Sequence, residues 1–255
     1  MVAGGLVALC CALLGVSLVL KRFSMIGDGL SHVGFGALSV AAVMNVAPLA
    51  IAVPVVIIAA FFILKLGKDS KVQSDSAIAL VSSVAIAIGV TVTSLSGGLN
   101  TDVYSYMFGS ILAMSKTDVY ISAVLSIVVL VLFFVFYHKI FAITFDSDFA
   151  KATGVKAEFY NMLIAVLTAL TIVVGMRIMG TMLISSLIIF PTLSASAVVK
   201  GFRKVVIISG IVSVVCFFVG LYSSYSFNLP VGASIVLANF VVFSILMLVG
   251  KLKRK

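Results

Sequence analysis

Long apolar segments, separated by short polar connections, run from one end of the chain to the other. A membrane-spanning helix needs roughly 20 mostly apolar residues. Nine segments approach that length: Val2–Leu20, Ser24–Met44, Pro48–Leu64, Ser76–Leu95, Asp118–Tyr137, Phe159–Gly175, Ile178–Val199, Val205–Tyr222 and Val231–Val249. Because a backbone surrounded by lipid must satisfy its own hydrogen bonds, the pattern predicts an all-α fold, a polytopic transmembrane helix bundle.

The connection between the fourth and fifth segments leaves the number of spans at eight or nine. Within Gly97–Thr117, the stretch Tyr104–Met114 is apolar enough to form a short re-entrant or interfacial helix. No long Pro/Gly/Ser linker, low-complexity tract or obvious internal repeat divides the chain, so residues 1–255 are expected to form a single transmembrane domain. The polar segment His138–Glu158 is too short to hold an ATPase, so any energy source must be another chain or an ion gradient.

The composition narrows the class of protein further. The 255 residues are 63% hydrophobic and only 10% charged, with a mean hydropathy of +1.34. Soluble domains are about 45–50% apolar and about 25% charged, so this chain has too few polar side chains to cover a water-exposed globule. A soluble enzyme and a disordered chain are excluded. The spread of apolar segments over the whole sequence also excludes a single-span receptor.

The charges predict an orientation in the membrane. With the N-terminus outside, 15 of the 17 Lys and Arg residues fall on the cytoplasmic side, and the exceptions are Lys116 and Arg177. Short basic loops stay in the cytoplasm, so the C-terminus is expected there. Orientation accounts for the net charge of +9 without a nucleic-acid partner. Arg177, which follows Gly175 and Met176, is expected to mark a tight outer turn by snorkelling.

One acidic residue and one histidine lie inside the second predicted span. Seven of the eight acidic residues fall in loops or at span ends, and Asp28 is the exception. An ionisable group in a bilayer is expensive, so its default interpretation is functional. His32 lies four residues later, on the same helix face and roughly 6 Å further along the axis. Ser31 and four glycines surround the pair and would let another helix approach closely: Gly27, Gly29, Gly34 and Gly36.

Three interpretations of this pair remain open from its spacing. A carboxylate and an imidazole suit Zn²⁺ and also Mn²⁺, and although two ligands are too few, a symmetric homodimer would offer two Asp and two His. The pair could instead relay protons. It could also be structural, with Asp28 and His32 satisfying one another inside the bundle.

Polar residues in the last spans have simpler interpretations. Pro191 is expected to kink its span, with Thr192, Ser194 and Ser196 available to satisfy the freed carbonyls. A kinked helix can line a pathway, although most simply pack. Asn239 is expected to form an interhelical hydrogen bond. No HExxH, GxSxG or Walker motif occurs in the chain, so we do not expect an enzyme.

Four stretches, in order and spacing, resemble motifs of one family. Gly27–Gly34 resembles the Gly-Asp-x-x-(Ser/Ala)-His signature of the membrane permeases of ATP-binding-cassette (ABC) zinc and manganese importers. Tyr106–Ala113 resembles the family's Leu-Phe-Gly-(Ser/Asp)-(Ile/Leu)-Leu-Ala segment. Phe145–Val155 resembles its cytoplasmic loop, and Arg177–Pro191 its penultimate motif. The resemblance covers nearly the whole chain. One departure is Gly29, where family members often carry a small apolar residue, so this helix is expected to be more flexible or more closely packed.

The resemblance implies a transport mechanism and its partners. The permease would form a homodimer, dock on cytoplasmic ATPase subunits, receive metal from an extracellular metal-binding lipoprotein or periplasmic protein, and lie in the plasma or inner membrane. No cofactor would be bound permanently; Zn²⁺ or Mn²⁺ would be transported by alternating access, with His ligation favouring zinc. Asp28 and His32 become metal contacts on a path to which Pro191 could contribute.

The resemblance also identifies the segment at about residues 139–158 as the cytoplasmic coupling loop. It would receive the closing motion of the ATPase. The coupling residues carried over are Asp146, Ser147, Asp148, Phe149, Ala150, Gly154 and Val155. Gly154 is expected to end a helix. The main alternative is an ATP-independent secondary transporter or channel that uses Asp28 as a cation or proton site.

Overall fold

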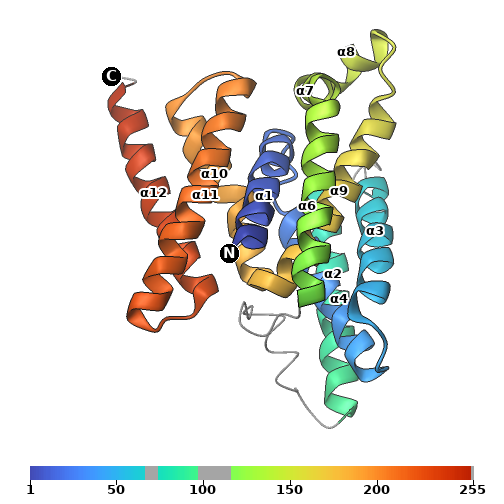
Figure 1. Ribbon diagram of the computed structural model, residues 1–255. Coiled ribbons are helices and arrows are strands. Elements are labelled where there is room, and N and C mark those ends of the chain that lie inside the picture. The colour runs from blue at the N-terminus through green and yellow to red at the C-terminus, as the bar shows by residue number, and fades with distance from the viewer. Residues whose placement is uncertain (67–73, 97–115, 254–255) are drawn as a thin grey trace.

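The computed structural model describes residues 1–66, 74–96 and 116–253, and within these ranges the regular structure is entirely helical (Figure 1). The helices are α1 (Val2–Leu20), α2 (Ile26–Val43), α3 (Pro48–Leu66), α4 (Ser74–Leu95), α6 (Lys116–Val135), α7 (Tyr137–Phe145), α8 (Ser147–Ala152), α9 (Ala157–Met179), α10 (Thr181–Val198), α11 (Phe202–Phe227) and α12 (Val231–Lys253). The predicted re-entrant helix Tyr104–Met114 and the motif Tyr106–Ala113 lie outside the described residues.

The predicted helix bundle of eight or nine spans is confirmed. Eight helices of the described part are long and apolar enough to cross a membrane. A ninth crossing is obtained if α6 and α7 are counted together, although the chain bends by 69° between them. The bend follows Val135, so the predicted span Asp118–Tyr137 ends two residues too late.

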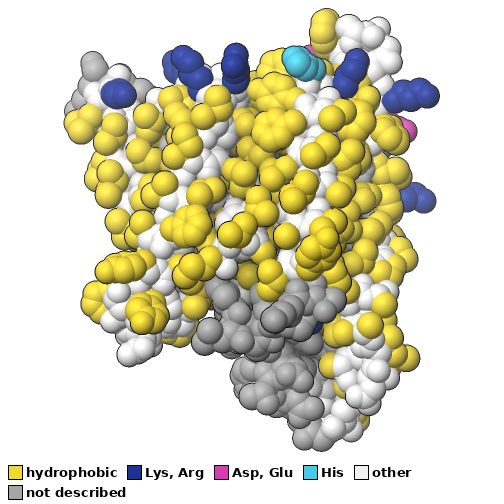
Figure 2. All heavy atoms as spheres, in the orientation of Figure 1, with side chains coloured by type: hydrophobic (Ala, Val, Ile, Leu, Met, Phe, Trp, Pro, Cys, Tyr) yellow, Lys and Arg dark blue, Asp and Glu magenta, His cyan; other side chains and the backbone are white. Residues whose placement is uncertain are grey.

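The spans differ in how much protein surrounds them. In α1, α2 and α9, 78%, 72% and 72% of the membrane-length window is buried, whereas α3, α4 and α12 reach only 28%, 22% and 22%. Figure 1 shows α12 at one edge of the bundle, α3 and α4 at the other, and α1 between them. Apolar side chains cover the visible flank in Figure 2, and Lys and Arg gather at the end that carries α7, α8 and the C-terminus. Because 72% of its membrane-length window is buried, α2, the second predicted span, lies inside the bundle.

The predicted outer turn at Gly175–Arg177 is wrong. Helix α9 continues to Met179, and the chain turns at Gly180, whose φ of 81° is readily adopted only by glycine. Gly175 serves packing instead, because a Cβ there would lie 2.8 Å from side-chain carbons of both Ile184 and Val7. Arg177 is half-buried in the last helical turn of α9.

Polar groups in the last spans bond differently from the prediction. Helix α10 runs through the buried Pro191, and the Thr192 hydroxyl donates to the Ile188 carbonyl at 3.2 Å. Within the described residues, the hydroxyls of Ser194 and Ser196 have no hydrogen-bond partner, so their predicted role is wrong. The Asn239 amide donates to Ile235 of its own helix at 2.9 Å, not to another helix. The carbonyl one turn back is always within reach of a helical side chain.

Candidate functional site

Asp28 is the third residue of α2 and lies in its first turn. The first N–H groups of a helix have no intrahelical acceptor, and they stabilise a negative charge placed beside them. The helix has no side-chain cap at Met25. A carboxylate is therefore favoured at this position although the surrounding sequence is apolar.

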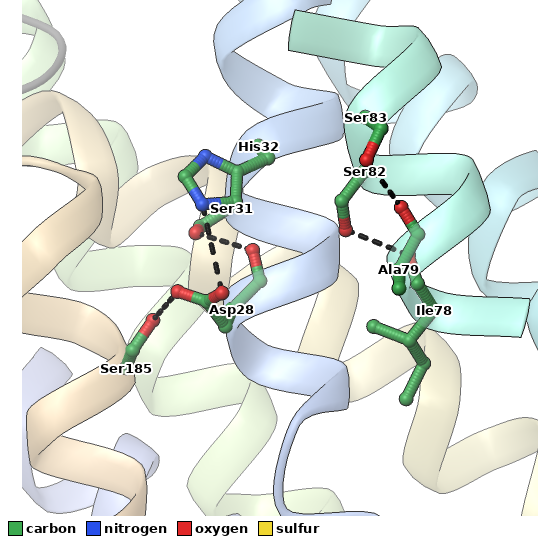
Figure 3. A network of polar contacts seen from close by, with 8 residues as sticks. All are labelled: Asp28, Ser31, His32, Ile78, Ala79, Ser82, Ser83 and Ser185. Carbon is green, nitrogen blue, oxygen red and sulfur yellow. Dashed lines mark hydrogen bonds and ion pairs between the residues drawn. The ribbon is translucent and has the colours of Figure 1, made fainter. Parts of the chain in front are cut away.

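Asp28 and His32 face one another along α2, as the four-residue spacing predicts. The His32 Nε2 lies 3.5 Å from the Asp28 Oδ2 (Figure 3). A third residue joins from α10, because the Ser185 hydroxyl donates to the other carboxylate oxygen, Oδ1, at 3.1 Å. The Ser31 hydroxyl donates to the Asp28 backbone carbonyl at 2.7 Å and makes no such contact with the carboxylate. Two helices thus fix the orientation of one acid.

The pair is partly open. The side chain of Asp28 is 41% exposed and that of His32 is 30% exposed. Among the described residues, no group of three or more His, Cys, Asp or Glu side chains is placed to hold a metal ion. A single copy of the protein therefore offers one carboxylate and one imidazole at this face of α2.

Each glycine of α2 marks a close neighbour. A Cβ at Gly27 would lie 2.6 Å from Ile188 Cδ1 of α10, and one at Gly34 would lie 2.5 Å from Met176 Sδ of α9. At Gly36 the obstacle is backbone, because a Cβ would lie 2.5 Å from the Ala85 carbonyl oxygen of α4. Small residues permit such approaches between membrane helices. The helix that carries Asp28 is held from three sides.

Gly29 belongs to the same packing. A Cβ there would collide with the Ile78 side chain of α4 and lie 3.2 Å from the Ser82 hydroxyl. Figure 3 shows this stretch of α4 beside α2. Of the two expectations for Gly29, closer packing is confirmed. The small apolar residue common in the family would require the Ile78 side chain to move.

The predicted coupling residues form a short capped helix, α8, at the basic end of the molecule. Asp146 accepts from the backbone N–H groups of Asp148 at 3.0 Å and Phe149 at 2.9 Å. Gly154, with φ 83°, donates to Lys151, and the Val155 N–H reaches back to Ala150. This is the glycine-terminated helix end expected for Gly154.

The side chains of α8 divide between packing and exposure. Ala150 is buried, whereas Phe149 is 65% exposed and the Asp148 side chain 90% exposed. Ser147 opens the helix and Val155 packs against the core. An aromatic ring and a carboxylate therefore face outward from a segment whose backbone is fixed.

Sequence reasoning missed Ser185. It lies 157 positions from Asp28, in the middle of an apolar span. The adjacent Ser186 looks equivalent in sequence, but its hydroxyl donates to Leu183 within α10 at 2.8 Å. Which of the two serines faces α2 depends on the rotation of α10, and the sequence did not give that rotation.

Comparisons with known proteins agree with this architecture. Residues 1–250 match the model of the ABC 3 transport family. A probable metal transport system membrane protein of Thermotoga maritima is 34% identical over 242 residues, 95% of this chain and 86% of that protein. The manganese import system permease protein ScaB of Streptococcus gordonii is 29% identical over 229 residues, 90% of this chain and 82% of that protein.

A solved structure is similar over nearly the whole fold. PsaBC from Streptococcus pneumoniae, solved in complex with a Fab, superposes with a TM-score of 0.85 at 28% sequence identity. The match covers 96% of this chain and 88% of that chain. The bundle described above is therefore shared with a chain of that solved structure.

Proposed function

The chain belongs to the ABC 3 transport family, and from this premise we propose that it is the membrane permease subunit of an importer for a divalent transition metal. The permease is not itself an enzyme; ATP hydrolysis is assigned to a separate subunit. The observation that carries the proposal is the Asp28–His32 pair, half-exposed on a central helix and oriented by Ser185.

Two copies of the chain complete the proposed metal site. One copy offers one carboxylate and one imidazole, and a metal in a four-coordinate site needs twice that number. A homodimer that brings the two α2 faces together would supply two Asp28 and two His32 side chains. Their partial exposure in one copy is what such an arrangement requires.

Manganese is the first metal to test, with zinc as its competitor. Imidazole ligation alone favours zinc, but mixed oxygen and nitrogen ligands also suit Mn²⁺. Relatives from several bacteria are named as manganese transport proteins. We give the manganese names of these relatives more weight than the preference for zinc that a single histidine indicates.

In the proposed cycle, an extracellular metal-binding protein delivers the ion and cytoplasmic ATPase subunits drive its release inward. Helix α8 would receive the motion of the ATPase, because its exposed Phe149 and Asp148 project from a rigidly capped turn. The N-terminus would lie outside and the basic end, with the C-terminus, in the cytoplasm.

Metal uptake into vesicles tests the proposal against its rival. Vesicles containing the permease with its ATPase, supplied on the outer side with the metal-binding protein, should accumulate ⁵⁴Mn²⁺ only when ATP is present on the ATPase side. Uptake of equal rate without ATP would favour a secondary transporter or channel. Unlabelled Zn²⁺ in competition orders the two metals.

Asp28→Asn tests the site itself. The substitution keeps the size of the side chain and removes its charge, so transport should fall to background while the dimer still assembles. Asp75→Asn is the matched control, because Asp75 is an exposed acid in the first turn of α4. Normal transport by Asp28→Asn would remove Asp28 from the metal path.

A further inference from the structure

A pocket of about 780 Å³ lies at the basic end of the bundle, apart from the Asp28 site. It is formed where the turn between α1 and α2 meets the end of α3, the α7–α8 junction and the start of α9. Its walls are mostly apolar and include the rings of Phe23, Phe61, Phe145 and Phe159. The volume falls within the range of ligand sites that bury most of a molecule.

Two lysines bring positive charge into this apolar pocket. Lys21 is half-buried, and its ammonium donates to the Asn161 side-chain oxygen, a neutral partner. Burial lowers the pKa of Lys21 from 10.5 to about 8. Lys65 lines the same pocket and is exposed, and among the described residues that line it the only acid is Glu158. The described lining of the pocket therefore combines apolar walls with a net positive charge.

We propose that this pocket binds a phospholipid, with the phosphate at Lys21 and Lys65 and an acyl chain along the phenylalanine walls. Basic pockets between membrane helices are suited to anionic lipid headgroups. A free phosphate ion would use the lysines but leave the aromatic walls in contact with water. An uncharged apolar ligand would leave the Lys21 ammonium desolvated, which is unfavourable. A phospholipid satisfies both parts of the lining.

The position of the pocket gives the lipid a structural role. Ile26 of the lining lies two residues before Asp28, and Phe145 and Ser147 of the lining flank the cap residue Asp146. A bound lipid would thus touch both the start of the metal-site helix and the start of α8. This inference is independent of which metal is transported.

Tryptophan fluorescence can test the site, because the chain contains no tryptophan. A single tryptophan is placed at Phe159 in the pocket, or at Phe134 of α6 outside it; the two side chains are 55% and 59% exposed. The full-length permease is reconstituted in phosphatidylcholine vesicles containing a small fraction of brominated phosphatidylglycerol. Quenching of Phe159→Trp should exceed that of Phe134→Trp about fivefold, the gain expected for a net charge of about +1 at the lipid headgroup, which is the two lysines less Glu158.

Charge variants then assign the effect to the pocket. Lys21→Met, made with Phe159→Trp, should reduce quenching to the level of Phe134→Trp, and Lys21→Arg should retain it. Lys139→Met is the control, because Lys139 is exposed on α7 and does not line the pocket. If Lys21→Met prevents folding, Lys65→Met tests the same site.

Three results would overturn the proposal. Equal quenching at the two tryptophan positions would show that phosphatidylglycerol is not enriched in the pocket. Unchanged quenching in the folded lysine variants would show that the headgroup does not use them. Reversal of the quenching by inorganic phosphate would assign the lysines to a free anion instead of a lipid.

Discussion

Helices α2 and α8 carry the two proposed activities of this permease and are built in opposite ways. Helix α2 has no side-chain cap and is held by glycine contacts with α4, α9 and α10. Helix α8 has six residues, a carboxylate cap at Asp146 and a glycine stop at Gly154, and only Ala150 among its side chains is buried. One is positioned by its neighbours and the other by its own sequence.

The two helices are therefore sensitive to different substitutions. The orientation of the Asp28–His32 pair depends on contacts between residues far apart in the chain, so a single added methyl group in α2 can displace it. The shape of α8 depends on neighbours within eight positions and should survive changes elsewhere in the bundle. Substitutions in α2, α8 and α10 test this difference directly.

Gly36→Ala should have the largest effect on stability. The new methyl would meet the Ala85 carbonyl of α4, and backbone cannot move aside as a side chain can. Overpacking of this kind costs about 1–3 kcal/mol, so the melting temperature in detergent should fall and transport should fall with it. Gly5→Ala in α1 is the control, because its nearest foreign atom would lie 3.5 Å away. A melting temperature unchanged by Gly36→Ala would contradict the tight α2–α4 contact.

Ser185→Ala should weaken metal affinity without unfolding the protein. It removes the hydrogen bond that fixes the Asp28 carboxylate, and bonds to charged groups contribute about 1.5–3 kcal/mol. Because Asp28 is partly exposed, we expect the lower end of that range, about a tenfold rise in the apparent KM for Mn²⁺.

Two neighbouring variants separate positioning from structure. Ser185→Thr keeps the hydroxyl and should restore affinity. Ser186→Ala removes a hydroxyl that bonds only within α10, and should leave KM unchanged. An equal rise in KM for both alanine variants would show that the Ser185 contact has no special role.

Asp146→Ala should have the smallest and most local effect. Loss of a helix cap costs about 1 kcal/mol, so amides of residues 147–152 should exchange faster with solvent while the melting temperature barely changes. Asp146→Asn keeps a capping oxygen and should behave as the parent. The test is hydrogen exchange together with the ratio of metal transported to ATP hydrolysed; unchanged exchange in Asp146→Ala would mean that tertiary contacts hold α8.

The sequence predicted the spans well because apolar length is a local signal. Eight of the nine predicted segments correspond to single spanning helices, and the fifth, Asp118–Tyr137, covers most of α6 and ends at the first residue of α7. The pairing of Asp28 with His32 followed from helix periodicity and is confirmed by the 3.5 Å contact. The end of α8 at Gly154 followed from a local rule as well.

What the sequence could not give depends on how helices are rotated against one another. Gly175 and Gly180 are both candidate turn residues in sequence, and only packing shows that Gly175 faces Ile184 and Val7. Ser185 and Ser186 differ only in which neighbour they face. The Asn239 amide N–H found an acceptor in its own helix, whereas its side-chain oxygen is buried and has no hydrogen-bond partner among the described residues.

The contacts around α2 also indicate where this bundle can slide. Against α4, backbone meets backbone at Gly36 and Ala85, an interlock that separates only if whole helices move apart. Against α10, the atoms that meet Gly27 and Asp28 are the tip of Ile188 and the hydroxyl of Ser185, both of which can swing on rotatable bonds. A rocking motion would therefore part α2 from α10 while α2 and α4 travel as one unit, and the acid would lose its serine as the passage opens.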